Sequence, residues 1–201
     1  MTHCGQFYIE VKVKVLVSTR TLESPGGFAF DAFERGFYNM FRDHDITALH
    51  NKKNQNFINL AATHDLLVLS GGDDHPQRLL TEIEMIKQFR ERKKPILGIC
   101  HGAILLTQLW GGKLIPVEGH RRTEHSVWYK YKQQTVNSYH GSGITDAPTD
   151  AKVLVTDDNG LIEAWQRENV IAVVWHPERD LKNNHWMPDE YHDIINKEKL
   201  I

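Results

Sequence analysis

One of the two cysteines stands where it can act as a nucleophile. Gly98-Ile99-Cys100-His101-Gly102 joins an apolar stretch to a segment of helical character. This is the thiol form of the G-x-S-x-G elbow, a tight turn that needs small residues two positions before and after the nucleophile. The helix that follows favours a thiolate electrostatically. The pentapeptide predicts a reactive Cys100, although a buried cysteine beside chance glycines would read the same.

A second segment offers the base that such a thiol requires. Trp175-His176-Pro177-Glu178 closes another apolar stretch. Residues two apart in extended backbone point to the same side, so His176 and Glu178 are expected to share a face. A carboxylate fixes the tautomer of a neighbouring imidazole, and the imidazole can deprotonate a thiol. The alternative is a His-Pro turn with an exposed acid.

A third segment, Leu69-Ser70-Gly71-Gly72-Asp73, also ends an apolar stretch. Paired glycines let the backbone approach a ligand closely and direct N–H groups at a developing oxyanion. The amide of His101, directly after Cys100, is the natural second donor. On its own, a Gly-Gly pair is equally an ordinary turn.

Strands and helices must bring these segments together, and the first half of the chain predicts them in alternation. Strands are expected at 12–18, 46–49, 66–70 and 95–99, with helices at 31–41, 78–92 and 102–110. Alternation implies a parallel α/β sheet, in which ligands bind beyond the carboxyl ends of the strands. The second half predicts more strands, at 126–131, 134–137, 152–156, 162–166 and 170–175, and a last helix at 188–200.

Two helices have explicit predicted faces. Asp31 is expected to cap the first helix, with Phe33, Phe37, Met40 and Phe41 on its buried side. In the helix at 78–92, Leu79, Ile83 and Ile86 share a face. Ser24-Pro25-Gly26-Gly27 predicts a loop and Asp157-Asp158-Asn159-Gly160 a hairpin turn.

Composition limits the class of protein. The 201 residues suit a single domain, and 24 basic against 26 acidic residues give a net charge of −2, which disfavours nucleic-acid binding. Cys4 and Cys100 cannot build a disulfide framework and fit a reducing, cytoplasmic setting. No secretory signal or membrane-length apolar run is present. The twelve histidines lack His-x3-His spacing, so most are interpreted as surface residues, and neither metal nor cofactor is expected.

Taken together, the segments resemble class I glutamine amidotransferases, the triad or C26-type family. The matching words are LVLSGGDD (67–74), PILGICHG (95–102), VNSYHG (136–141) and VVWHPE (173–178), in the family's order over essentially the whole chain. The resemblance implies one domain over residues 1–201. Its fold would be a flavodoxin-like three-layer α/β sandwich with a mostly parallel mixed sheet and a β-rich second half.

The resemblance also implies roles. Cys100 would be the nucleophile, His176 the base and acid, and Glu178 the residue that orients the imidazole. Gly72 and His101 would supply the oxyanion-hole amides. The substrate's glutamyl group would be held by residues near Gly71 and in the segment Asn137, Ser138, Tyr139 and His140.

One departure bears on the substrate. Relatives that use glutamine commonly carry Gln four residues after the nucleophile, where this chain has Ile104. Ile cannot make amide hydrogen bonds, which favours a stand-alone γ-glutamyl hydrolase over a glutaminase subunit that serves a synthase partner. SGGDD and the NS-x-H segment resemble γ-glutamyl-γ-aminobutyrate hydrolases.

The stretch 118–125 and the WHPER ending resemble γ-glutamyl-CDP-amidate hydrolases. Arg121 and Arg122 are candidates to bind an anionic leaving group, because arginine forks bind phosphate and carboxylate in bidentate fashion; the alternative is a solvated loop. A non-catalytic binding protein is the third interpretation. A small-molecule substrate is expected, without nucleic acid or membrane, and a homo-oligomer is compatible with the sequence.

Overall fold

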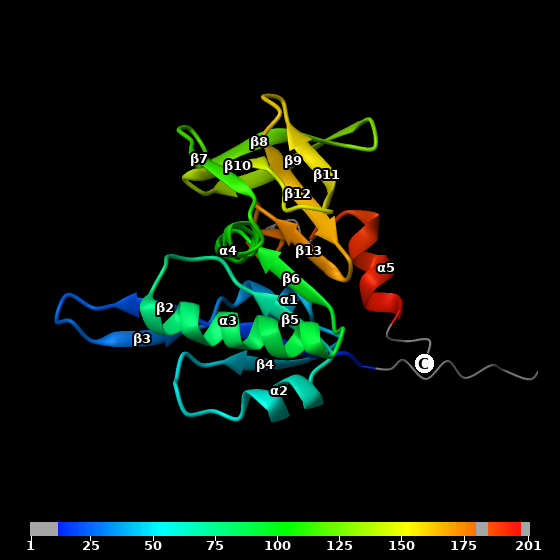
Figure 1. The fold of residues 1–201 in the computed structure, drawn as a ribbon. Helices are drawn as coiled ribbons and strands as arrows, with labels where there is room; N and C mark the ends of the chain where they lie inside the picture. Colours follow the sequence, from blue (N-terminus) through cyan, green and yellow to red (C-terminus); the bar gives the residue numbers. More distant parts are fainter. Residues whose placement is uncertain (1–11, 180–184, 198–201) are drawn as a thin grey trace, which may run out of the picture.

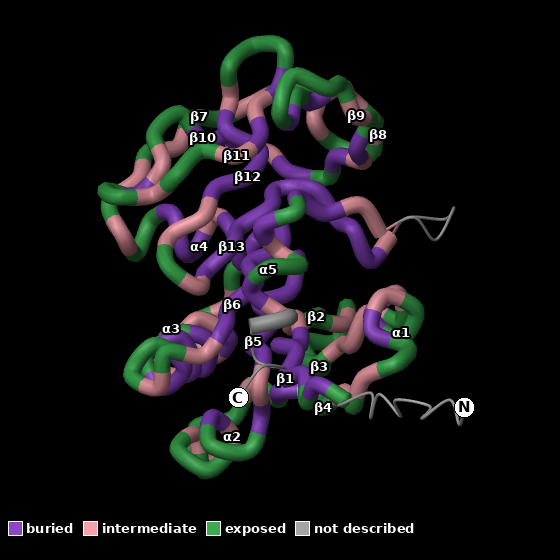
Figure 2. The backbone as a smooth tube through the Cα atoms, turned by 90° about the vertical axis from the view of Figure 1, so that its right-hand side faces the viewer, coloured by how far each residue is buried: buried purple, intermediate pink, exposed green. Residues whose placement is uncertain are grey.

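The computed structural model describes residues 12–179 and 185–197, and five parallel strands form its centre (Figure 1). Their order in the sheet is β4-β1-β5-β6-β13. The bounds are Lys14–Ser18 for β1, Asp45–Leu49 for β4, Leu66–Leu69 for β5, Ile96–Ile99 for β6 and Val170–Val173 for β13. β5, β6 and β13 are buried throughout, as expected for strands covered on both faces (Figure 2).

Helices cover both faces of this sheet. α2 (Phe57–Thr63), α3 (Pro76–Glu91) and α4 (His101–Leu109) pack in a cluster with Leu16, Leu67 and Ala172. On the other side, α1 (Gly36–Met40), the Phe41 that directly follows it, and α5 (Asp189–Lys197) contribute Phe37, Phe41 and Ile194 to a cluster with Val15, Val17 and Val173. Neighbouring residues of β1 therefore enter opposite cores, which gives three layers.

The second half extends the sheet with antiparallel strands. β12 (Ile162–Arg167) pairs with β13, and the order continues through β11 (Lys152–Asp157), β8 (Arg121–Tyr129) and β9 (Lys132–Tyr139). β10 (Ser142–Asp146) pairs with β12 and with β7 (Lys113–Pro116). The expected α/β sandwich with a β-rich second half is confirmed. β8 and β9 are longer than predicted because their polar, half-exposed ends lack an apolar pattern.

The predicted helix cap at Asp31 is wrong. Asp31 lies in β3 (Ala29–Ala32), which forms a hairpin with β2 (Arg20–Glu23) around the predicted loop at 24–27. Its carboxylate accepts hydrogen bonds from the backbone and side-chain amides of Asn51, at 2.9 and 2.8 Å. α1 begins five residues later, so Phe37 and Phe41 still reach the core.

The predicted face of the helix at 78–92 is confirmed only in part. Ile86 is buried and Leu79 packs against the core, but Ile83 is exposed. The buried side of α3 also includes Arg78, Glu82, Met85 and Phe89. Two charged residues occupy the inner face, and the apolar pattern could not reveal them. The short helix α2 and strands β2, β3, β7 and β10 were not predicted. None of the described helices has the length and apolar character needed to cross a membrane.

A buried hydrogen bond joins α4 to the antiparallel half and gives a stability prediction. Trp165 Nε1 donates to Thr107 Oγ1 at 2.9 Å, and both side chains are buried. Thr107→Val preserves shape but leaves the indole N–H unpaired, so the free energy of unfolding should fall by about 1–3 kcal/mol. Denaturant unfolding followed by tryptophan fluorescence measures this. Thr63→Val, which alters an exposed helical hydroxyl, is the control and should change stability far less; equal effects would contradict the prediction.

Candidate active site

Cys100 lies at the turn between β6 and α4 with an unusual backbone. Its φ is 49° and its ψ −101°, a conformation that costs L-residues free energy and recurs at functional sites. Its backbone N–H donates to Val173 O at 2.9 Å, which ties the elbow to β13. A Cβ on Gly102 would lie 2.4 Å from Leu69 O, and one on Gly98 2.9 Å from Ala103 N. Both glycines are therefore required by close backbone approach.

His176 and Glu178 meet as the sequence suggested, but not on extended backbone. β13 ends at Val173, and Pro177–Arg179 form a 3-10 turn instead of a continued strand. Within that turn His176 Nδ1 lies 2.6 Å from Glu178 Oε1, and both side chains are 1% exposed. The two side chains do meet, but the predicted extended backbone was wrong. The 3-10 turn, and not the alternation of a strand, brings the carboxylate to the imidazole.

The electrostatics of His176 favour its protonated form. Burial lowers the pKa of an imidazole, but hydrogen bonding to Cys100 and Glu178 and the charge of Glu178 outweigh burial and raise the pKa of His176 to about 9. The side chain is then imidazolium at neutral pH. A positive charge beside a thiol favours the thiolate, which is the nucleophilic form. Cys100, His176 and Glu178 can therefore form a charge-paired nucleophile, acid and orienting group.

Two neighbours fix the position of His176. Asn137 Nδ2 donates to His176 O at 2.8 Å, and His176 N donates to Asn137 Oδ1 at 2.9 Å. A Cβ on Gly71 would lie 2.2 Å from His176 Cε1, so only glycine leaves room for the ring. The sequence predicted Asn137 and Gly71 as substrate contacts, whereas here they contact His176.

A buried arginine orients the loop after β5. Arg78 Nη1 donates to Gly71 O at 3.2 Å and to Asp73 O at 3.3 Å, and Nη2 donates to Ser70 O at 2.6 Å. Because a trans peptide is planar, the Gly72 N–H points opposite to the Gly71 carbonyl and hence away from Arg78. Gly72 itself has a φ of 130°, which favours glycine. This geometry suits an oxyanion donor.

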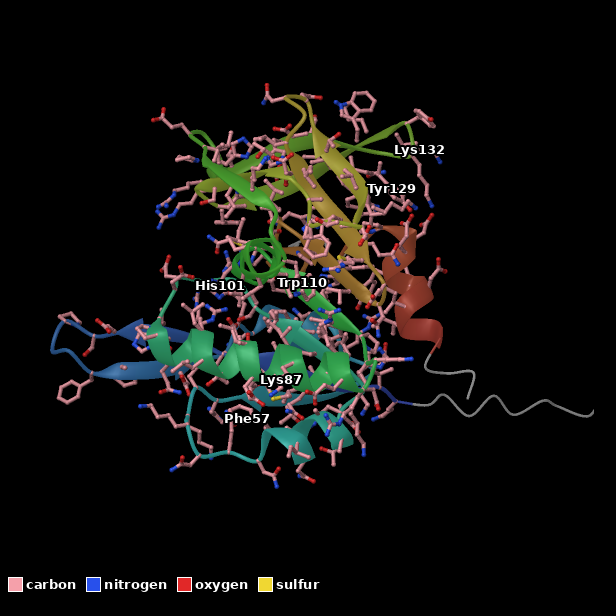
Figure 3. All side chains as sticks on the ribbon, in the orientation of Figure 1. Phe57, Lys87, His101, Trp110, Tyr129 and Lys132 are labelled. Atoms are coloured by element: carbon pink, nitrogen blue, oxygen red, sulfur yellow. The ribbon has the colours of Figure 1, made fainter. Side chains whose placement is uncertain are left out.

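His101 begins α4, and its backbone N–H is among the first of a helix, which have no intrahelical partner. Its side chain points toward α3, where Nε2 lies 2.8 Å from Glu82 Oε2 (Figure 3). Nδ1 lies 3.0 Å from Asp74 Oδ1. Burial raises the pKa of Glu82, but hydrogen bonding from His101 and the charge of Arg78 outweigh it and lower the pKa below its ordinary value.

Tyr139 and Arg179 form one rim of the site. The Tyr139 ring packs edge-on against His176, with centroids 5.4 Å apart, and the Arg179 guanidinium lies 4.8 Å from the Tyr139 centroid. Arg179 Nη2 donates to Glu34 Oε2 at 2.8 Å. Burial raises the pKa of Glu34, but the bond from Arg179 outweighs it and lowers the pKa. The sequence analysis did not predict the Arg179–Glu34 pair, although Arg179 is the last residue of the WHPER motif.

The remaining candidate residues lie on the β8–β9 arm. Arg121 pairs with Tyr139 in the sheet, and Arg122 follows at a β-bulge with a φ of 57°. Both are exposed. Ser138 is fully buried and donates to His120 O, and His140 is buried with Nδ1 2.9 Å from Ser142 O. These two side chains are thus engaged by the protein itself.

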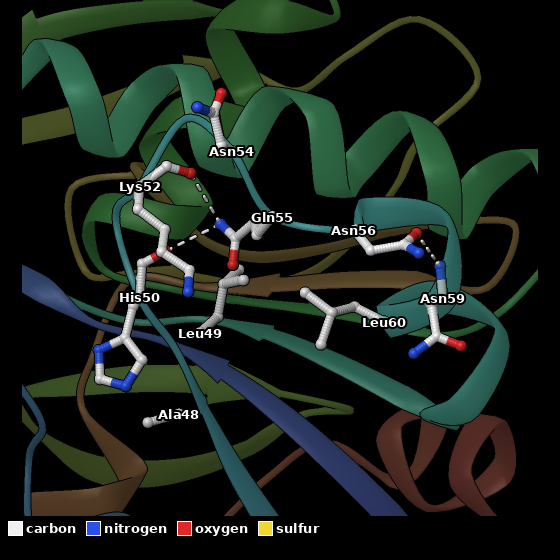
Figure 4. Close-up of a pocket in the computed structure, with 9 residues that line it drawn as sticks. All are labelled: Ala48, Leu49, His50, Lys52, Asn54, Gln55, Asn56, Asn59 and Leu60. Atoms are coloured by element: carbon white, nitrogen blue, oxygen red, sulfur yellow. Dashed lines mark hydrogen bonds between the residues drawn. The ribbon is translucent and has the colours of Figure 1, made fainter.

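Ile104 lies one turn into α4, half-buried, with its backbone N–H bonded to Cys100 O at 3.0 Å. A hollow between β4 and α2 is lined mainly by polar residues and contains none of the candidate residues (Figure 4). It lies at the edge strand, separated from β6 by β1 and β5. Cys4 falls outside the described residues.

Comparison with known families identifies the chain. Residues 31–193 match the model of the family described as glutamine amidotransferase class-I. The chain belongs to this family. The match includes the elbow at Cys100 and the turn at His176, so the sequence-based resemblance is confirmed.

The individual relatives are named for different activities. The chain is 30% identical over 125 residues to a gamma-glutamyl-CDP-amidate hydrolase of Campylobacter jejuni, covering 57% of this chain and 62% of that protein. It is 27% identical over 195 residues to a glutamine amidotransferase-like protein of Lactococcus lactis, covering 76% and 83%. It is also 35% identical over 121 residues to a carbamoyl phosphate synthase small chain of Sulfurisphaera tokodaii, covering 56% and 32%.

Solved structures agree on the fold. A protein from Thermoplasma acidophilum, described as part of a GMP synthase, superimposes with a TM-score of 0.68 at 18% identity, covering 92% of this chain and 94% of that one. A glutamine amidotransferase from Thermotoga maritima gives 0.66 at 18%, covering 95% and 87%. The flavodoxin-like fold class is confirmed.

The His176–Glu178 pair predicts a pH dependence. Cys100 and Glu178 both raise the pKa of His176, and Glu178→Gln removes the Glu178 charge, so the imidazole should lose its proton at a lower pH than in the wild type, where the pKa is about 9. Stabilisation from a raised pKa is present below about 6.5 and lost as pH rises through the folded value, so the wild type should lose more of this stability toward pH 9 than the variant. NMR titration of histidine-labelled protein, with His176→Gln to assign the signal, measures the shift. Glu84→Gln is the control, and an unchanged midpoint in Glu178→Gln would contradict the assignment.

Proposed function

We propose that this class I glutamine amidotransferase family member hydrolyses γ-glutamyl amides through a thioester on Cys100. The observation that carries the proposal is a strained cysteine hydrogen-bonded to a buried imidazole, whose other nitrogen lies 2.6 Å from a carboxylate oxygen. A nucleophile beside a base that a third group orients is the general arrangement for acyl transfer.

Each step follows from a named group. The Cys100 thiolate attacks the γ-carbonyl carbon, and the oxyanion accepts hydrogen bonds from the Gly72 and His101 amides. The imidazolium of His176 gives its proton to the departing nitrogen as the C–N bond breaks. Water then attacks the thioester while His176 takes one of its protons, and glutamate leaves with Cys100 restored. Glu178 accepts the hydrogen bond from the Nδ1–H of His176 throughout.

The leaving group is the open part of the proposal. We favour a stand-alone hydrolase of an anionic γ-glutamyl amide, such as γ-glutamyl-CDP-amidate, because a relative at 30% identity is named for that substrate. Ile104 also lacks the amide that glutamine-using relatives commonly place there. The alternative is a glutaminase subunit with a synthase partner, as relatives named as synthase chains suggest. Cysteine, histidine and glutamate are all present at the triad positions, which favours an enzyme. A non-catalytic binding protein is therefore the least favoured alternative.

Two arginines supply a basis for anion recognition. Arg121 sits opposite Tyr139 in the β8–β9 pairing, and the Tyr139 ring contacts His176. A substrate with its γ-carbonyl at Cys100 would therefore extend its leaving group past Tyr139 toward Arg121 and Arg122. Binding energy from such a remote group can be spent in the transition state.

The thioester gives the direct test of the reaction. Cys100→Ala should abolish turnover of glutamine and of γ-glutamyl amides, since the proposed thioester cannot form without the Cys100 sulfur. Acid quenching of the wild type followed by peptide mass spectrometry should find a glutamyl adduct on the peptide that contains Cys100. Cys4→Ala is the matched control and should remain nearly fully active. Retained turnover in Cys100→Ala would overturn the proposal.

Substrate preference separates hydrolase from glutaminase. An anionic γ-glutamyl amide should give a higher kcat/KM than glutamine by orders of magnitude. Charge-assisted hydrogen bonds contribute about 1.5–3 kcal/mol each, so Arg121→Ala with Arg122→Ala should reduce that preference at least ~10-fold. The glutamine rate should change little.

Lys132→Ala, at the far end of the same hairpin, is the control for charge removal (Figure 3). Steady-state kinetics with both substrates measures each effect. Better use of glutamine, stimulation by an added synthase and no effect of the arginine changes would instead support the glutaminase subunit.

A further inference from the structure

Three histidines and a glutamate converge inside the antiparallel half, away from the proposed nucleophile. His120 precedes β8, His125 lies within β8, His140 follows β9, and Glu163 lies on β12. The side chains of Glu163 and His140 are 1% and 3% exposed. Sequence analysis expected surface histidines because the residues lack regular spacing; strand pairing brings them together instead.

Their ligating atoms lie close to one another. One atom each from His120, His125 and Glu163 can be chosen so that all lie within 4.8 Å. His125 Nε2 is 3.4 Å and His140 Nε2 3.8 Å from Glu163 Oε1. Zn–N and Zn–O bonds of about 2.0–2.2 Å at tetrahedral angles place ligand atoms roughly 3.3–3.6 Å apart. Small side-chain rotations would therefore suffice to enclose an ion.

Hydrogen bonding leaves lone pairs facing one another. If His140 Nδ1 carries the proton donated to Ser142 O, Nε2 presents a lone pair toward the Glu163 carboxylate. Among the described residues, His140 Nε2, both ring nitrogens of His125, His120 Nδ1 and Glu163 Oε2 have no hydrogen-bond partner. Buried polar groups are normally paired, so this cluster lacks a positive partner. A proton on His125 or a bound cation could supply it.

We propose that His120, His125, His140 and Glu163 bind one divalent transition-metal ion of the zinc type. Imidazole and carboxylate ligands suit zinc, and four ligands complete a tetrahedral structural site. The bond from His140 Nδ1 to a backbone carbonyl is the kind of contact that orients a metal-bound histidine. The number of nitrogen ligands and the burial of the carboxylate favour a metal over a lone proton.

The ion would act as a clamp beside the reaction site. His120 adjoins Arg121, and His140 adjoins Tyr139. Glu163 O accepts from Val174 N at 2.9 Å, two residues before His176. A metal at this point would tie the β8–β9 arm, with Arg121 and Tyr139, to the segment that leads into His176. It takes no part in the chemical steps, so its effect is on the position of the arm.

Zinc titration tests the site without reference to activity. Protein freed of metal by a chelator and dialysed should bind one equivalent of Zn²⁺ in competition with a chromophoric chelator, and its melting temperature should rise with free zinc. His120→Ala removes a ligand outright and Glu163→Gln removes the negative charge of the carboxylate, so each should weaken binding at least ~10²-fold. His50→Ala, an exposed histidine outside the cluster, should leave the affinity unchanged. Cys100→Ala should also retain it, which separates this site from the nucleophile.

The outcomes decide between a metal and a proton. Absence of stoichiometric binding in the folded wild type would overturn the proposal and leave a protonated His125 as the partner of Glu163. Equal affinity in His120→Ala, or loss in Cys100→Ala, would overturn it as well. If the ligand variants have a strongly lowered melting temperature, the visible absorption of the Co²⁺-loaded wild type replaces them as the test. Intense bands of tetrahedral Co²⁺ would support the site, and a weak octahedral spectrum would reject it. Because no substrate is used, failure of the proposed hydrolase reaction would not affect this result.

Discussion

The buried ion pair between Arg78 and Glu82 is the interaction on which the site depends most. The two residues lie one turn apart on α3, with Nε and Oε1 3.0 Å apart and neither side chain exposed. Arg78 binds the carbonyls after β5, and Glu82 binds His101 at the start of α4 and Ser18 at the end of β1. Leaving one such charge unpaired in a core costs about 3–5 kcal/mol. The pair thus connects three segments at the carboxyl edge of the sheet.

Both candidate oxyanion donors are governed by this pair. Arg78 sets the orientation of the peptide between Gly71 and Gly72, while Glu82 holds the residue whose backbone amide follows Cys100. A replacement of the pair by apolar residues could preserve packing and still release the Gly71–Gly72 peptide. The charged residues on the inner face of α3 therefore position the Gly71–Gly72 peptide and His101, which apolar side chains could not do.

The sequence predicted the parallel centre and the candidate triad residues because their signals are local. Each signal occupies only a few consecutive residues, as do the short apolar strands, the glycines around Cys100 and the His-Pro-Glu motif. It failed where partners are distant in sequence. The apolar pattern of the helix did not indicate that Arg78 and Glu82 are buried, and nothing near Asn137 in the sequence indicated its hydrogen bond to the His176 backbone. Asp31 resembled a helix cap because its strand is short and exposed.

The topology explains how two of the candidate residues come together. β6 and β13 are adjacent and parallel, and the Cys100 N–H donates to Val173 O, so Cys100 and His176 follow neighbouring strand ends despite their distance in the sequence. The intervening chain forms β7 to β12 and returns as the antiparallel arm. Changes in that arm can alter Arg121, Arg122 or Tyr139 without moving the β6–β13 register. For the proposed function, this arrangement would separate bond cleavage, which needs fixed geometry, from the choice of leaving group, which would depend on the arm.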